Sequence, residues 1–188
     1  MSANIAPMAM MLPQLPDEVA ALVEHKDFQA LEDVWTRRMD ESPEDLPFFI
    51  AIAAALKKRA GGDVVLPWLR FLADYHAEDG RQDARVAVLL EIARMFPADE
   101  AIRGELEEAL RRRFAGHPAL AAVLAQFPLT GSADPSEVGS RIASWLRFAP
   151  GDVFLMLPSD AFVAGLASFL LAHLAYVVGF VALGLTAW

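Results

Sequence analysis

The chain has 188 residues, a formal net charge of −9 at pH 7 and no cysteine. The absence of cysteine excludes disulfide bonds, thiolate catalysis and cysteine-based zinc sites. The acidic balance argues against direct nucleic-acid binding, which needs a basic face to neutralise phosphates. Hydrophobic residues make up 55% of the chain. This share is high for a soluble protein, and an apolar stretch at the end of the sequence supplies much of the excess.

Residues 1–16 are expected to form a disordered leader. Their sequence, MSANIAPMAMMLPQLP, has no positively charged start and closes with prolines, so it makes a poor secretory signal. A first short helix is predicted from Asp17. A second follows, with apolar residues at helical spacing: Phe28, Leu31, Val34 and Trp35.

The helical period continues to about residue 148. Further helices are expected over 44–59, from Asp63 to Gly80, over 82–95, from Asp99 to Gly116, and in two shorter stretches near 118–126 and 135–148. Ser42 is the predicted N-cap of the third helix, with Pro43 in its first turn. Asp63 is the predicted cap of the fourth, whose start Pro67 confines to the first turn.

These helices predict an all-α fold in which antiparallel hairpins stack as an α-solenoid-like helical repeat. Helix starts near Asp27, Asp63 and Asp99 are evenly spaced along the chain. Stacks of this kind usually present a concave face to a protein partner. The repeat domain is assigned to residues 17–148, followed by a juxtamembrane linker over 149–160.

Four stretches of the helical region carry a resemblance: LVEHKDFQALEDVWTRRM, DLPFFIAIAAALKK, EALRRRFAGHPALAAVLAQF and RIASWLRFAPGDVFLM. Over residues 17–156 the chain resembles the N-terminal helical, tetratricopeptide-like region of the large Gre-type (GreA/GreB) transcription elongation factors. The resemblance implies a partner-binding role, with RNA polymerase as a candidate partner. It does not extend to transcript-cleavage domains, so it implies no cleavage activity.

The last stretch, residues 161–188, reads AFVAGLASFLLAHLAYVVGFVALGLTAW and contains no Asp, Glu, Lys or Arg. It exceeds the roughly 20 apolar residues that a membrane crossing needs. A single C-terminal transmembrane helix is therefore predicted after the repeat domain. Arg141 and Arg147 precede it, which favours a single-pass membrane protein with a cytoplasmic N-terminal domain.

Two faces of this predicted helix are distinct. Aromatic residues, a glycine and the one histidine share a membrane face within an arc of about 80°: Phe162, Gly165, Phe169, His173, Tyr176 and Phe180. A stripe of small residues, Ala164, Ser168 and Ala172, is suited to close helix association. The small stripe predicts a homo-oligomer formed through this helix.

Residues 151–181 carry a second resemblance. Gly151-Asp152-Val153-Phe154-Leu155-Met156-Leu157-Pro158 and the aromatic face that follows resemble a segment of the YhhN family of polytopic membrane proteins. That family includes lysoplasmalogenases, which hydrolyse the vinyl-ether bond of lysoplasmalogens. The resemblance implies that Asp152 and His173 are catalytic. The chain departs from the family because one membrane helix is predicted where the family has several.

The same residues have simpler interpretations. His173 could instead be a neutral imidazole bonded across a helix dimer, and Asp152 could form a turn. The other histidines lack metal-ligand spacing, and HExxH, P-loop and GxGxxG motifs do not occur, so neither metal nor cofactor is expected. Arg111, Arg112 and Arg113 follow three glutamates, a pattern typical of a helix end with i,i+4 ion pairs.

Two functions of different classes follow. The first is a non-enzymatic protein-interaction module of Gre-like helical repeats, tethered to a membrane. The alternative is a fragment or fusion of a YhhN-type membrane lysoplasmalogenase. Hydrolysis of a lysoplasmalogen by the purified chain distinguishes them.

Overall fold

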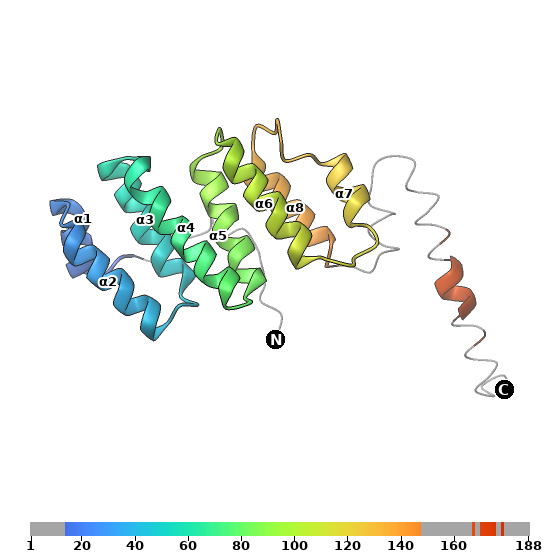
Figure 1. The fold of residues 1–188 in the computed structure, drawn as a ribbon, viewed down its shortest axis with the longest axis horizontal. Helices are drawn as coiled ribbons and strands as arrows, with labels where there is room; N and C mark the ends of the chain where they lie inside the picture. The colour runs from blue at the N-terminus through green and yellow to red at the C-terminus, as the bar shows by residue number, and fades with distance from the viewer. Residues whose placement is uncertain (1–13, 148–166, 168–169, 176–177, 179–188) are drawn as a thin grey trace. The chain divides into compact units, whose positions relative to one another are not determined.

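The computed structural model describes residues 14–147, 167, 170–175 and 178, and these residues contain helices without a β-strand. The helices are α1 (Asp17–His25), α2 (Phe28–Glu41), α3 (Leu46–Ala60), α4 (Gly62–Glu78), α5 (Gln82–Met95), α6 (Glu100–Arg113), α7 (Leu120–Gln126) and α8 (Pro135–Trp145). Figure 1 labels each of these helices. The predicted all-α class is confirmed, and α5 has the predicted bounds.

The chain divides into two compact units. The first combines residues 1–113 with 129–140, and the second combines 114–128 with 141–188. Helices α1 to α6 and the beginning of α8 therefore belong to the first unit, and α7 and the end of α8 to the second.

In the first unit, α3 packs against α4, α4 against α5 and α5 against α6, and α1 packs against α2. Alternate helices also touch, because α3 contacts both α1 and α5. The side chains of α3 and α5 are accordingly among the most buried, including Phe49, Ile52, Leu89 and Ile92. Trp35 of α2 packs on Phe49, with ring centroids 4.7 Å apart.

Aspartate side chains cap several of these helices. Asp27 Oδ1 accepts a hydrogen bond from the Ala30 amide (3.2 Å), and Asp99 Oδ1 accepts one from the Ala101 amide (2.9 Å). Each carboxylate satisfies an amide that the first helical turn leaves unpaired. The caps at Asp27 and Asp99 agree with the helix starts predicted there.

The starts of α3 and α4 differ from the prediction. The cap of α3 is Asp45 rather than Ser42, because residues 42–45 close a separate turn in which the Asp45 amide donates to the Ser42 carbonyl (3.0 Å). Helix α4 begins at Gly62 with Gly61 as its N-cap, so Asp63 lies inside the first turn. Pro67 lies within the helix, where it removes one backbone hydrogen bond.

In the second unit, the described side chains form a small apolar cluster. Phe127 and Trp145 meet edge to face with ring centroids 4.8 Å apart. Val123 and Leu124 of α7 and Ile142 of α8 are buried.

The prediction of a C-terminal transmembrane helix is wrong. Within the described part of the chain, no helix combines the length and the apolar character that a membrane crossing needs. A bilayer core of about 30 Å requires roughly 20 residues.

Candidate functional site

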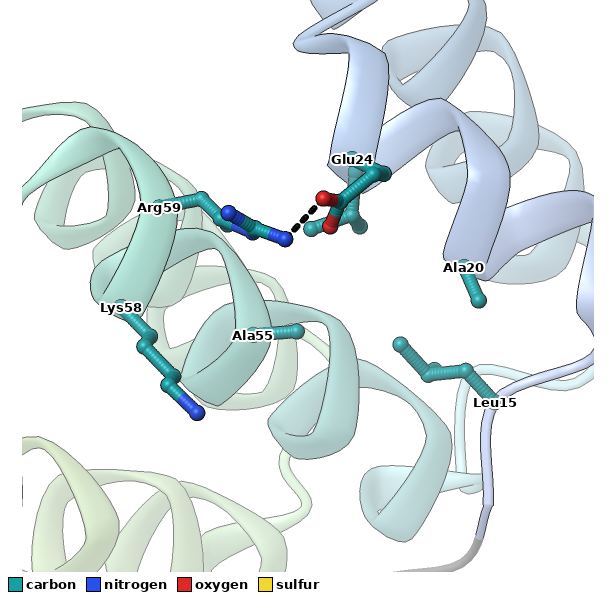
Figure 2. A pocket seen from close by; sticks show the side chains of 7 residues that line it. Leu15, Ala20, Glu24, Ala55, Lys58 and Arg59 are labelled. Atoms are coloured by element: carbon teal, nitrogen blue, oxygen red, sulfur yellow. Dashed lines mark hydrogen bonds and ion pairs between the residues drawn. The ribbon is translucent and has the colours of Figure 1, made fainter.

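A groove between α1 and α3 is the candidate binding site of the first unit (Figure 2). It has a volume of about 440 Å³ and is lined by Leu15, Ala20, Val23, Glu24, Ala55, Lys58 and Arg59. This volume falls within the range of about 300–1,000 Å³ that is usual for ligand pockets. We refer to these seven residues as the α1–α3 groove.

The groove exists because small side chains face each other across the two helices. Val23 and Leu56 point into the core and are at most 4% exposed. Ala20 and Ala55 stand on the adjoining faces and are too short to fill the space between the helices, and the side chain of Leu15 extends between them in Figure 2. The groove therefore has an apolar lining that opens to solvent.

Charged groups stand at the rim of the groove. Arg59 forms an ion pair with Glu24 across it, and both side chains are about half exposed. Lys58 extends in a different direction in Figure 2, and its ammonium has no hydrogen-bond or ion-pair partner among the described residues. The rim consequently holds one paired and one unpaired cation.

Sequence reasoning missed this groove. It explained the run Lys57-Lys58-Arg59 through the dipole of the helix end, and this run does occupy the last turn of α3. Lys57 donates to the Met95 carbonyl and Arg59 pairs with Glu24, whereas Lys58 has no partner among the described residues. The sequence does place alanines near the two other cations at the end of α3. This pattern indicates a groove only once α1 is known to lie beside α3.

His76 is a second unusual group in the first unit. The ring is 0% exposed in the last turn of α4, and neither nitrogen has a well-formed hydrogen bond among the described residues. Burial lowers the pKa of His76 below its ordinary value of 6.5, and the positive charge of Arg81 lowers the pKa further. Asp79, the Pro43 carbonyl and Glu44 act in the opposite direction.

Most of the site residues predicted in the C-terminal stretch lie outside the described residues: Asp152, Phe162, Ala164, Gly165, Ser168, Phe169, Tyr176 and Phe180. Ala172 and His173 are described, and both are exposed on the helical run 170–175. The structure thus tests neither the pairing of Asp152 with His173 nor the predicted helix association.

The arginine run at the end of α6 has the predicted structural role. Arg111 pairs with Glu107 (2.7 Å), Arg112 pairs with Glu108, and Arg113 Nε donates to Asp83 (2.6 Å). Over the described parts of the chain, the acidic and histidine side chains form no cluster suited to a metal ion.

Comparison with known proteins gives one match. Residues 113–188 match the sequence model of the YhhN family. No curated protein and no solved structure gives a significant match to the chain.

The match confirms the resemblance predicted over 151–181 and extends it toward the N-terminus. Its start at Arg113 coincides with the end of the first segment of the first unit. Nothing in the comparisons supports the Gre-type resemblance.

Proposed function

We propose that the chain acts at a membrane as a YhhN-type hydrolase that cleaves the vinyl-ether bond of lysoplasmalogens. The observation that carries the proposal is the family match over residues 113–188. It is supported by the Gly151-Asp152 motif and by the exposed apolar side chains of the described C-terminal helical residues, which include Leu171 and Val178.

The proposed reaction requires a proton donor and a water molecule. Protonation of the vinyl carbon that is not bonded to oxygen gives an oxocarbenium ion, water adds to the carbon next to oxygen, and the resulting hemiacetal collapses to an aldehyde and the free glycerol hydroxyl. A carboxyl or an imidazole can donate the first proton or accept one from the attacking water. Asp152 and His173 are the proposed pair for these two steps.

The test is aldehyde release from a lysoplasmalogen by the purified full-length chain in detergent. Asp152→Asn and His173→Ala are expected to abolish aldehyde release, whereas His25→Ala, which changes an exposed histidine of α1, retains it. Unchanged rates in the Asp152 and His173 variants would contradict the proposed catalytic pair. No aldehyde release by the wild-type chain would contradict the proposed hydrolase activity.

A second function is proposed for helices α1 to α6, namely binding of a protein partner. It is favoured by the α1–α3 groove, because this groove lies on the surface of the helical stack and is not needed to pack its core. Proximity labelling in the native cell tests it. Deletion of residues 17–113 is expected to remove a set of labelled proteins that His173→Ala leaves in place; the same set recovered from both variants would contradict the proposal.

A further inference from the structure

The α1–α3 groove combines two features that select a particular chemistry. Its lining carries the aliphatic or methyl side chains of Leu15, Ala20, Val23 and Ala55, and its rim carries Lys58 and Arg59 against one acid, Glu24. An occupant that satisfies both features has an aliphatic group next to a carboxylate.

The cations at the rim are available to such an occupant. Lys58 has no partner among the described residues. A carboxylate that binds its ammonium therefore displaces water and breaks no existing ion pair. Arg59 is paired with Glu24, but both side chains are about half exposed, and an exposed pair contributes only about 0–1 kcal/mol. Arg59 can therefore exchange Glu24 for an incoming carboxylate at low cost.

The net charge of the whole chain also favours an acidic partner at this groove. The net charge is −9, so an acidic partner is repelled from most of the surface and is attracted where cations concentrate. The end of α3 supplies Lys57, Lys58 and Arg59 in succession. A basic partner would instead find many acidic positions and would have no reason to choose this groove.

We propose that the α1–α3 groove binds a leucine-bearing acidic segment of a protein partner, with a leucine side chain packed against Leu15, Ala20 and Ala55 and carboxylates at Lys58 and Arg59. The inference rests on the second proposed function, the partner-binding role of helices α1 to α6. A second copy of the chain fits less well. The acidic face of its α2, which includes Glu32, Asp33 and Asp40 and forms an open hollow, is lined without an aliphatic side chain.

The experiment measures binding of a fluorescein-labelled peptide of about twelve residues, with leucines at i and i+4 among glutamates, to the full-length chain. Fluorescence polarisation reports the affinity. Two comparison peptides replace all glutamates by lysine or both leucines by serine. The expected result is binding of the leucine–glutamate peptide and at least roughly fivefold weaker binding of each comparison peptide.

Variants of the chain locate the site. Lys58→Glu is expected to weaken binding about fivefold or more, whereas the matched charge reversal Arg37→Glu on the exposed face of α2 leaves it unchanged. Ala55→Trp fills the groove and is expected to block the peptide, and Ala101→Trp, at an exposed alanine of α6, is its control. Circular dichroism checks each fold. Lys58 is exposed, so its variant still decides the question if Ala55→Trp unfolds.

Several results would overturn the proposal: equal binding of the lysine peptide, equal weakening by Arg37→Glu and Lys58→Glu, or no binding of the leucine–glutamate peptide. Self-association that Lys58→Glu abolishes, or binding of the chain to anionic phosphatidylserine vesicles through Lys58 in place of the peptide, would assign the groove to another occupant. The proximity-labelling experiment tests the partner-binding role without reference to this groove. It therefore distinguishes a wrongly assigned occupant from the absence of a partner-binding role.

Discussion

Gly139 of α8 lies against the side chain of Leu106 in α6. A Cβ atom added at Gly139 would stand 2.9 Å from Leu106 Cδ2 and 2.8 Å from Leu90 Cδ2. Leu106 is 0% exposed and Leu90 5% exposed, so neither has solvent to move into. The close approach of α8 to α5 and α6 within the first unit therefore depends on the missing side chain.

Gly139→Ala is expected to destabilise the first unit by about 1–3 kcal/mol, because the added methyl overpacks a buried contact. The helix preference of alanine over glycine, about 1 kcal/mol, acts in the opposite direction and reduces the loss. Urea unfolding followed by circular dichroism measures the change.

Gly104→Ala is the matched control for this change. Gly104 also lies within a helix, α6, but an added Cβ there would meet nothing within 4 Å. Alanine is expected to stabilise the chain by about 0.5–1 kcal/mol through helix preference alone. Equal effects of the two variants would show that α8 does not pack against Leu106 in solution.

Asp45 serves two partners at the start of α3. Its Oδ1 accepts from the Phe48 amide (3.4 Å), and its Oδ2 accepts from Arg38 Nε of α2 (3.1 Å). Asp45→Ala is expected to cost about 1–2 kcal/mol, chiefly through the lost cap with a smaller share from the ion pair, whose side chains are 38% and 28% exposed.

The control for Asp45 is Asp33→Ala, which removes a carboxylate from the exposed face of α2 where it caps no helix. It is expected to change the free energy of unfolding by less than about 0.5 kcal/mol. A loss at Asp33 as large as the loss at Asp45 would show that net charge, rather than the cap, sets the effect.

The helices were predictable because their limits are local. The bounds of α5 follow from apolar spacing together with Gly80 before it and Pro97 after it. The starts of α3 and α4 were less accurate. Ser42 and Asp63 are both suitable caps by residue type, and the choice of Asp45 involves Arg38, which lies on another helix.

The candidate site was less predictable than the helices. The α1–α3 groove depends on two alanines from separate helices that face each other. No local sequence pattern predicts that these two alanines lie opposite one another. The apolar composition of residues 161–188 suggested a membrane crossing. Length and composition alone were insufficient, because no helix in the described part of the chain is both long and apolar enough to span a membrane.

His76 predicts a loss of stability in mild acid. Its pKa in the folded chain is lowered, mainly by burial and then by Arg81, relative to the ordinary value of 6.5. The unfolded chain therefore binds the proton more readily. Stability is unaffected well above pH 6.5 and falls as the pH drops through 6.5 toward the lower folded pKa, by at most about 1.4 kcal/mol per unit of pKa difference.

Chemical denaturation at pH 7.5, 6.5 and 5.5 measures this dependence. His76→Leu is expected to flatten it, because the buried titrating ring is gone. His25→Leu, at an exposed position of α1, should retain the wild-type slope. The neighbouring charges Arg81, Asp79 and Glu44 remain in both variants, so a slope that persists in His76→Leu would show that protonation of His76 does not cause the acid sensitivity.

The described helical residues near the C-terminus expose an apolar stripe. Leu170, Leu171, Leu174 and Val178 are between 53% and 66% exposed, and at 100° per residue the three leucines of the run 170–175 fall within an arc of about 100°. The proposed membrane role predicts that lipid or detergent contacts this stripe. Leu171→Glu combined with Leu174→Glu should then shift the chain from the membrane fraction to the soluble fraction, because each charge disfavours an apolar environment.

The matched control is Phe28→Glu combined with Phe71→Glu, which places the same charges at exposed aromatic positions of α2 and α4. This double variant should remain in the membrane fraction, since α2 and α4 lie outside the family match that motivates the membrane role. Fractionation by ultracentrifugation followed by immunoblotting reads out both. If the Phe28/Phe71 variant moves to the soluble fraction and the Leu171/Leu174 variant does not, the contact with the membrane belongs to helices α2 and α4.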